Sequence, residues 1–456
     1  MLALVTLLLP LGLLIFSVYR GWPVLLAAPV MALLAALLAA DPLFATLTQR
    51  FMPATGSFVV TFLPLFLLGA VFGKLMEASG AAMARARAIV TGLGPQQALP
   101  AVVLSCAVLT YGGVSLFVVA FAVYPLAVAL FRESDLPQRL IPAAIALGAF
   151  TFTMSALPGS PAIQNAIPMP YFGTTAFAAP GLGVIAGIIM ALGGTIYLSS
   201  VARKTGADGL MVISKPARVD EAGLPPLWLA LVPILTVFAA NWLLAELVFP
   251  RLDLDYLADP SWGGVTASRV IGVWALIGAL TLAIVLLLGL SWRRLADPRQ
   301  TLGDGAQAAL LPLFNTAALV GFGSVVAALP AFAAVNALTV QMPGGPLIGL
   351  AASASLLAGI TGSASGGMSI ALDALGARYL DIAMAEGIDP EALHRIVTLA
   401  TGGLDALPHN GAVVTLLGIA RLTHKEAYGP IFVVAVVIPV VALAAALALA
   451  SWLGSF

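Results

Sequence analysis

Two polar interruptions in otherwise apolar sequence carry the residue types that could bind a ligand. The first is the run 361–369, Thr-Gly-Ser-Ala-Ser-Gly-Gly-Met-Ser, and the second is the run 404–411, Leu-Asp-Ala-Leu-Pro-His-Asn-Gly. Glycine lets the backbone approach a ligand closely, and proline ends a helix. The hydroxyl, imidazole and amide side chains beside them supply hydrogen bonds. These two stretches therefore predict a binding site inside an apolar environment.

The first half of the chain repeats both interruptions. Residues 111–115 read Tyr-Gly-Gly-Val-Ser and match Ser-Gly-Gly-Met-Ser at 365–369. Residues 156–161, Ala-Leu-Pro-Gly-Ser-Pro, match Ala-Leu-Pro-His-Asn-Gly at 406–411. Paired apolar segments interrupted by Gly and Pro in two halves point to the binding site of a secondary transporter. Transport is therefore the leading hypothesis.

Composition places the chain among polytopic membrane proteins. Of its 456 residues 61% are hydrophobic and only 9% are charged, which leaves too little polar surface for a soluble globule. The formal net charge is zero and gives no sign of a nucleic-acid partner. Because Cys106 is the only cysteine, we expect no intramolecular disulfide and no thiolate metal site. Nothing in the sequence indicates a cofactor.

Apolar runs follow the same order in both halves, judged against the roughly 20 residues that a helix needs to cross a bilayer. The first repeat, 1–202, is predicted to hold a re-entrant hairpin at 97–131 and a broken helix at 139–171. The second repeat, 225–456, is predicted to hold a hairpin at 345–380 and a broken helix at 391–420. Full crossings are predicted near 1–18, 22–40, 57–78, 180–202, 225–248, 268–292, 305–328 and 427–452.

This pattern predicts an all-α polytopic membrane protein built from two inverted repeats. Each half has five crossings, counting the broken helix, and an odd number inverts the second half relative to the first. The polar segment 203–224 joins them as a linker. If that linker is cytoplasmic, fifteen of the 20 Lys and Arg residues fall on the cytoplasmic side, as the positive-inside rule requires. The remaining five are Arg50, Arg251, Arg269, Arg378 and Arg395.

A hairpin arm or helix that stops inside the membrane leaves backbone N–H groups and the positive end of its dipole free to bind an anion. Since most basic residues fall at predicted helix ends or in loops, we expect these backbone groups to hold the substrate. Glycines supply the close approach and serines add hydroxyls, although small residues also pack helices tightly in membrane bundles. The hairpin candidates are Gly112, Gly113, Ser115, Ser363, Ser365, Gly366, Gly367 and Ser369.

The broken helices add further polar candidates, and two of these residues could carry a proton. Ionisable residues at membrane depth are costly and usually functional. His409 titrates near neutral pH when unperturbed, and Asp405 lies four residues before it, one helical turn away. His409 could alternatively stay neutral and only orient the substrate. The substrate-binding candidates here are Ser155, Ser160, Asn165, His409 and Asn410, and the proton-coupling candidates are His409 and Asp405.

Two hairpins, each followed by a proline-broken helix, resemble the ion-transporter superfamily of elevator carriers. Within it, the runs 156–161 and 407–411 resemble the gluconate permease family. The resemblance implies proton-coupled uptake of a small organic acid across the bacterial cytoplasmic membrane by a homodimer whose hairpins slide against a scaffold. Gluconate permeases carry a more polar, histidine-containing first broken helix than this chain. A shorter acid such as 3-hydroxybutyrate is therefore a candidate beside gluconate.

Three alternatives remain open at this stage. Unwound carbonyls beside Asn165 and Asn410 could bind sodium instead of a proton carrier. A channel would also need polar groups at membrane depth. Ser365 upstream of His409 resembles the Ser/His dyad of intramembrane rhomboid proteases, although the duplicated Gly/Ser tip has no histidine in the matching broken helix. Which organic acid is carried, the oligomeric state and the direction of transport stay open.

Overall fold

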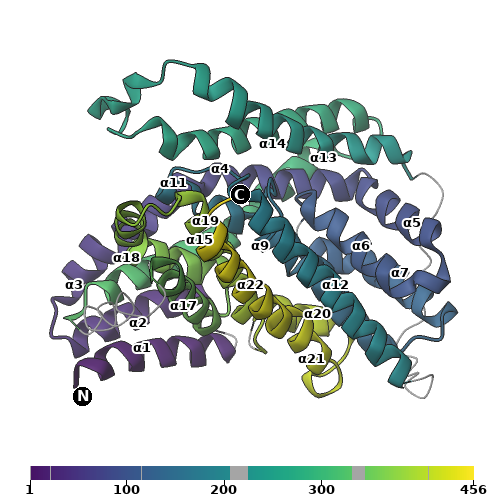
Figure 1. The fold of residues 1–456 in the computed structure, drawn as a ribbon, viewed down its shortest axis with the longest axis horizontal. Helices are drawn as coiled ribbons and strands as arrows, with labels where there is room; N and C mark the ends of the chain where they lie inside the picture. The colour runs from purple at the N-terminus through teal and green to yellow at the C-terminus, as the bar shows by residue number, and fades with distance from the viewer. Residues whose placement is uncertain (1, 21, 115, 206–223, 331–344, 409) are drawn as a thin grey trace.

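The computed structural model describes residues 2–20, 22–114, 116–205, 224–330, 345–408 and 410–456, and these are helical with short connections (Figure 1). Within these residues, six helical segments are long and apolar enough to cross a membrane by length and composition. They are Leu43–Ala78, Pro180–Lys204, Leu227–Arg251, Pro260–Ser291, Pro298–Ala327 and His424–Leu453. The predicted all-helical, polytopic membrane fold is thus confirmed at this level.

The first half of the chain, up to the linker, forms twelve α-helical elements within the described residues. A π-helical turn, Leu47–Phe51, joins α3 to α4. The elements are α1 Leu2–Tyr19, α2 Val24–Leu38, α3 Leu43–Thr46, α4 Met52–Ala78, α5 Ala81–Leu93, α6 Ala98–Tyr111, α7 Leu116–Glu133, α8 Ile141–Ala149, α9 Phe152–Ser155, α10 Ile163–Ala166, α11 Met169–Phe172 and α12 Pro180–Thr205.

The second half follows the same order of long helices, hairpin and broken helix in its described part. A π-helical turn, Val433–Val437, joins its last two helices. The elements are α13 Leu227–Trp242, α14 Ala267–Ser291, α15 Pro298–Ala327, α17 Gly345–Thr361, α18 Ala364–Ala385, α19 Pro390–Leu404, α20 Gly411–Ala420, α21 His424–Phe432 and α22 Ile438–Leu453.

Helices α4 and α15 pack along each other through the middle of the molecule. A Cβ at Gly305, near the start of α15, would meet Val71 near the end of α4, and a Cβ at Gly321 would meet Thr55 near the start of α4. The two helices therefore run antiparallel, and glycines let their backbones approach closely. α2 packs on α15, and α14 packs on α4.

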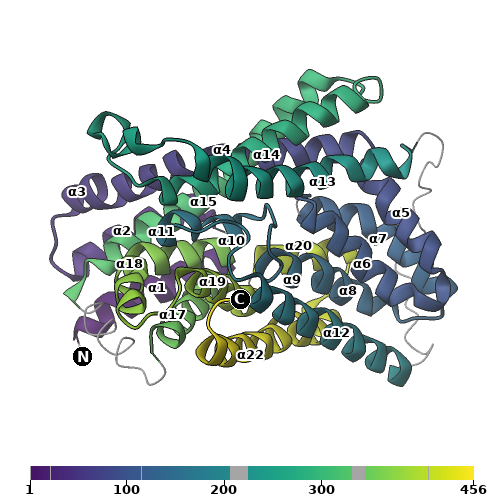
Figure 2. The ribbon, with the colours of Figure 1, turned by 45° about the horizontal axis from the view of Figure 1, so that its top comes forward.

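The two hairpins lie at opposite ends of the long axis of the molecule (Figures 1 and 2). α6 packs on α7 in the first hairpin, and α17 packs on α18 in the second. A Cβ at Gly367 of α18 would overlap the backbone of Ala358 in α17. This glycine therefore lets the arms of the second hairpin pack at backbone distance.

Both broken helices are interrupted by unwound chain. The first consists of α8, α9, α10 and α11, and residues 156–162 between α9 and α10 are not helical. There Gly159 adopts a φ of 76°, which favours glycine. In the second, α19 ends at Leu404 and α20 begins at Gly411. The helix breaks fall at the predicted Pro-containing runs.

Each hairpin packs against both broken helices. α6 and α7 pack on α8 of the first broken helix, and α7 also packs on α20 of the second. α17 and α18 pack on α19, and α18 also contacts α10 and α11. The hairpins and broken helices thus form one interlocked unit. The division into inverted repeats at 1–202, 203–224 and 225–456 stays a prediction, and the helix α5 was not predicted.

Candidate substrate site

The second hairpin turns at Gly362 and Ser363, at the beginning of the predicted 361–369 interruption. Gly362 has a φ of 61°, and the Ser363 side chain caps α18 by accepting from the backbone N–H of Gly366 at 3.1 Å. The Gly367 N–H donates to the Ser363 carbonyl at 2.9 Å. Gly366 and Gly367 therefore lie inside the first turns of α18.

The matching glycines of the first hairpin lie in a different place. α6 ends at Tyr111, so Gly112 and Gly113 form the turn itself, and Gly113 has a φ of 81°. Their N–H groups donate to Val108 O at 3.2 Å and to Thr110 O at 2.9 Å. The two hairpins thus share a Gly-Gly sequence but place these glycines differently.

All four glycines have N–H acceptors within their own hairpin, so the expectation that they offer free backbone donors is corrected. Their part in substrate binding stays a prediction. Ser115, the serine of the first motif, lies outside the described residues.

The start of α20 meets the second hairpin tip. Asn410 caps α20, because its Oδ1 accepts from Ala412 N at 2.6 Å and from Val413 N at 3.1 Å. Its Nδ2 donates to the Gly362 carbonyl at 3.0 Å. The N-termini of α18 and α20 are therefore held side by side, and their dipoles add positive potential at one place.

A row of hydroxyl groups runs from this tip to α15. Ser363 Oγ lies 3.4 Å from Ser365 Oγ, and Thr316 Oγ1 on α15 lies 3.5 Å from Ser365 Oγ. Ser369, by contrast, donates to the Ser365 carbonyl of its own helix at 2.7 Å. Ser363 and Ser365 can therefore offer hydroxyls to a ligand, whereas the hydroxyls of Ser369 and Thr316 already donate to carbonyls of their own helices, that of Thr316 to Pro312 O at 2.9 Å.

Asp405 follows α19 directly and carries a buried carboxylate oxygen, Oδ1, that has no hydrogen-bond partner in the described part of the chain. It lies next to the second hairpin, because a Cβ at Gly359 of α17 would be 3.0 Å from the Cβ of Leu404. A buried carboxylate oxygen without a hydrogen bond is costly. A proton or a cation on Asp405 would remove that cost.

The first broken helix is held by the first hairpin. The Tyr111 hydroxyl donates to the Pro158 carbonyl at 2.6 Å, and a Cβ at Gly113 would lie 3.2 Å from the Pro161 ring. Ser160 is fully buried, and its Oγ accepts from the Ala162 N–H at 3.2 Å. Tyr111 thus satisfies a carbonyl that the helix break exposes.

Ser155 lies on a different surface of the first broken helix. It donates to the Thr151 carbonyl at 3.2 Å and packs where a Cβ at Gly402 of α19 would meet its Oγ at 2.6 Å. Ser155 and Ser160 are therefore engaged within the protein, and their role in substrate binding stays a prediction.

A buried polar cluster surrounds Arg395, and of its members the sequence predicted only Asn165 as a polar site residue. Arg395 and His394 of α19 are fully buried. Arg395 donates from Nη2 to Ala178 O at 2.7 Å and to Ala176 O at 3.4 Å, and from Nε to Ala178 O at 3.0 Å. Its Nη1 donates to Asn165 Oδ1 at 3.2 Å. Arg395 thus ties α19 to the chain around α11.

Asn165 and His394 complete this cluster. Asn165 Nδ2 donates to Ser160 O at 3.0 Å and to Ala176 O at 2.9 Å. The His394 ring nitrogens lie 2.6 Å from Thr174 Oγ1 and 3.3 Å from Asn165 Oδ1. The Asn165 amide therefore makes its hydrogen bonds to backbone carbonyls and to α19. Its predicted role in substrate binding stays a prediction.

The sequence predicted that Arg395 lies at a helix end on the outer side of the membrane. The burial of its side chain corrects this prediction. The signal that could have found it is the pair Asp389-Pro390, because Asp at the N-cap and Pro at the first helical position mark a helix start. The Asp389 side chain indeed accepts from the Glu391 N–H at 2.8 Å. That start puts His394 and Arg395 into the second turn of α19, below the surface.

A cavity of about 310 Å³ lies between the second hairpin and the central helices. It separates α18 from α4, α14 and the end of the first broken helix. Charged residues from both sides line it, namely Asp373 and Asp381 of α18 and Arg269 of α14. In the described part of the chain, no group of three or more His, Cys, Asp or Glu side chains could hold a metal ion.

The sequence comparison identifies the family. The chain is 42% identical over 453 residues to the uncharacterized transporter YxjC of Bacillus subtilis (strain 168), and the match covers 95% of this chain and 96% of YxjC. The chain belongs to the family of YxjC. It is therefore a multi-pass membrane transporter with a bacterial relative, and not an enzyme. No protein-family model matches the sequence.

Two solved transporter structures resemble the fold. MtrF of Neisseria gonorrhoeae, described within a class of antimetabolite efflux pumps, matches with a TM-score of 0.54 and 14% identity over 90% of this chain and 84% of MtrF. The YdaH transporter of Alcanivorax borkumensis matches with a TM-score of 0.49 and 17% identity over 87% of this chain and 86% of YdaH. At such low identity the likeness to MtrF concerns the fold alone.

The resemblance to the gluconate permease family is wrong. The match over nearly the whole chain is to YxjC, and the matching fold is that of MtrF. The motifs behind the resemblance are short runs of Pro, Gly and Asn at the helix breaks. Any transporter that must interrupt a helix inside a membrane needs such residues. Membership of the YxjC family therefore replaces that assignment, and gluconate specificity has no support.

Replacing Arg395 with Met should destabilise the protein strongly. The change strands the Ala178 carbonyl at a buried site, which costs about 1–3 kcal/mol, whereas the Ala176 carbonyl keeps the Gly159 N–H and Asn165 Nδ2 as donors. The matched control is Arg378→Met, because Arg378 is exposed on α18. Melting temperatures in detergent should fall by several degrees for Arg395→Met and stay near the parent value for Arg378→Met. Equal melting temperatures for both variants would contradict the tethering role.

Proposed function

We propose that this transporter is a symporter that carries a small organic-acid anion together with a proton. Its site is formed by the second hairpin tip, the start of α20 and Asp405. The transport step is an elevator movement of the interlocked hairpins and broken helices, and the working unit is a homodimer. We define the substrate only as a small carboxylate.

The observation that carries this proposal is the meeting of two helix N-termini at the second tip. Asn410 joins the start of α20 to the Gly362 carbonyl at the start of α18. The first residues of a helix have N–H groups without intrahelical acceptors, and in α18 these belong to Ala364 and Ser365. Such groups bind carboxylates without a cationic side chain. The hydroxyls of Ser363 and Ser365 add donors beside them.

Coupling to a proton is supported by the carboxylate oxygen of Asp405, Oδ1, that has no hydrogen-bond partner among the described residues. A buried anionic side chain beside an incoming substrate anion would repel it, and binding a proton to Asp405 removes that repulsion. The sequence places His409 four residues further on; this residue lies outside the described residues. Sodium bound by unwound carbonyls is the competing coupling ion, and it is an outcome of the test below.

The elevator movement is supported by the way the helices pack. The hairpins and broken helices interlock with one another, whereas α4, α15, α2 and α14 form a separate packed group around the antiparallel pair. The two groups meet where α18 crosses α15 and where α11, at the end of the first broken helix, packs on α14. Sliding at these contacts would carry the site across the membrane. The protease alternative is excluded, because the chain belongs to a family of transporters.

Replacing Asp405 with Asn should uncouple transport from the proton. A thermal-shift screen of short carboxylates on the purified protein first supplies the substrate. In proteoliposomes, the parent should accumulate it under an inward proton gradient and not under a sodium gradient. Asp405→Asn should lose that accumulation by about 5- to 150-fold, the usual range of coupling between two ligands, because the amide cannot exchange a proton. It should keep substrate exchange.

The control for this experiment is Asp304→Asn, which changes an exposed carboxylate on α15 and should accumulate substrate like the parent. Accumulation by the parent that follows a sodium gradient would contradict the proton assignment. Proton-driven accumulation that survives in Asp405→Asn would contradict the role of Asp405.

A disulfide between α15 and α18 should stop transport and leave substrate binding intact. A Cβ at Gly323 of α15 would lie 3.1 Å from the Cβ of Ile370 in α18, close to the spacing of a disulfide. The test is Gly323→Cys with Ile370→Cys in a Cys106→Ala background. Oxidation should abolish uptake in proteoliposomes, and reduction should restore it, because the cross-link fixes the moving unit to the central helices.

The matched control joins two elements of the moving unit. A Cβ at Gly359 of α17 would lie 3.0 Å from the Cβ of Leu404 in α19. The pair Gly359→Cys and Leu404→Cys should therefore form a disulfide and still transport. Full transport by the oxidised Gly323/Ile370 pair would rule out sliding at the α15–α18 contact.

A further inference from the structure

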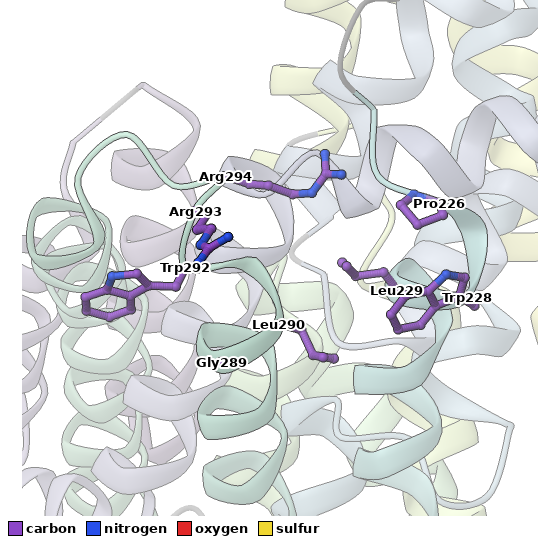
Figure 3. A pocket seen from close by; sticks show the side chains of 8 residues that line it. All are labelled: Pro226, Trp228, Leu229, Gly289, Leu290, Trp292, Arg293 and Arg294. Carbon is purple, nitrogen blue, oxygen red and sulfur yellow. The ribbon is translucent and has the colours of Figure 1, made fainter.

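The cavity of about 310 Å³ beside α18 is lined by charges of opposite sign that come from different helices. Asp373 and Asp381 line it from α18, and Arg269 lines it from the start of α14. A second cavity, where α13 begins and α14 ends, differs in this respect, because its charged lining residues among those described are both arginines (Figure 3). Only the cavity beside α18 therefore offers both a cation and an anion a partner.

The three charged side chains of this cavity do not neutralise one another. Among the described residues, none of them takes part in an ion pair or a hydrogen bond, and all three residues are exposed. Segment 331–344, outside the described residues, contains no charged residue or histidine. Leu224, where the described chain resumes after 206–223, lies near Gly80, beyond the far end of α4 from this cavity. The charges are therefore available to a ligand.

Most of the other lining residues are apolar or aromatic. Tyr171 lies against α18, because a Cβ at Gly376 would be 3.4 Å from its ring, and Asp373 acts electrostatically on its hydroxyl. The apolar wall is built from several helices, with Phe58 of α4, Val320 of α15 and Leu380 of α18. A carboxylate, a guanidinium and an apolar wall are the complements of an ammonium, a carboxylate and an apolar side chain.

We propose that this cavity binds a small zwitterion, namely an α-amino acid with an apolar side chain. Asp373 holds the ammonium through charge-assisted hydrogen bonds, and Arg269 holds the carboxylate with its planar fork of donors. A simple anion or a simple cation would satisfy only one of these two groups. The site is distinct from the proposed substrate site, because the cavity is not lined by Ser363, Ser365, Asp405 or Asn410.

A ligand in this cavity would contact both packed groups of helices. Asp373 belongs to the second hairpin, whereas Arg269 belongs to α14 beside the central pair. The bound amino acid would therefore tether α18 to α14 and oppose sliding between the two groups. This consequence rests on the elevator movement proposed above, whereas binding itself does not.

The test measures binding of radiolabelled L-leucine to the purified full-length protein in detergent. Isoamylamine lacks the carboxylate of leucine and isocaproate lacks its ammonium, so each should displace leucine about tenfold or more weakly than unlabelled leucine does. Asp373→Asn and Arg269→Gln should each weaken leucine binding about 10- to 150-fold, as expected for a lost hydrogen bond to a charged group. Arg378→Gln is the matched control and should bind like the parent, because Arg378 is exposed on α18 but does not line the cavity.

A further variant keeps the charges and fills the space. Ala377 lines the cavity from α18, so Ala377→Leu should weaken leucine binding even if a charge variant misfolds. Asp405→Asn should leave leucine binding unchanged. Loss of binding in that variant would assign leucine to the proposed substrate site and overturn the proposal. Absent leucine binding to the parent, or displacement by isocaproate as strong as by leucine, would overturn it as well.

Discussion

The need to satisfy backbone polar groups inside a membrane governs this structure. Water is absent there, so each carbonyl freed by a helix break must find a donor within the protein. Long side chains from other helices supply those donors. At the two breaks, Tyr111 donates to Pro158 O and Tyr428 to Ala406 O, and a His424 ring nitrogen lies 2.9 Å from Pro408 O. In the non-helical segment between α11 and α12, Arg395 donates to Ala176 O and Ala178 O. These hydrogen bonds offset the free-energy cost of two unwound segments at membrane depth.

The same constraint decides where chemistry can occur. Once the carbonyls are paired, the described polar groups still open to a ligand around the second break include the N–H groups of Ala364 and Ser365 at the start of α18 and the Oδ1 of Asp405. Donors of helix origin attract an anion, and an unpaired carboxylate beside them attracts a proton or cation. An anion and a positively charged partner would therefore stabilise one another in this site. That mutual dependence is what symport requires.

The sequence predicted the long helices, because apolar runs of membrane length have few other structures available. It also placed both breaks correctly at Pro158 and Pro408. The sequence did not predict the structural role of the two Gly-Gly pairs, because that role depends on where each pair lies relative to a helix. Gly112 and Gly113 form a turn, whereas Gly366 and Gly367 pack inside α18. It missed the burial of His394 and Arg395 because hydropathy treats a charge near a helix start as exposed. It indicated the wrong family, because the Pro, Gly and Asn runs at the helix breaks are needed by any transporter that interrupts a helix inside a membrane.

We propose that helix N-termini, and not a cationic side chain, hold the substrate carboxylate. The most direct measurement is a cryo-EM structure with the carboxylate that the thermal-shift screen identifies. We expect carboxylate oxygens at hydrogen-bonding distance, about 2.7–3.2 Å, from the N–H groups of Ala364 and Ser365 and from the Ser363 hydroxyl. A carboxylate paired with the guanidinium of Arg395 or of Arg269 would contradict it.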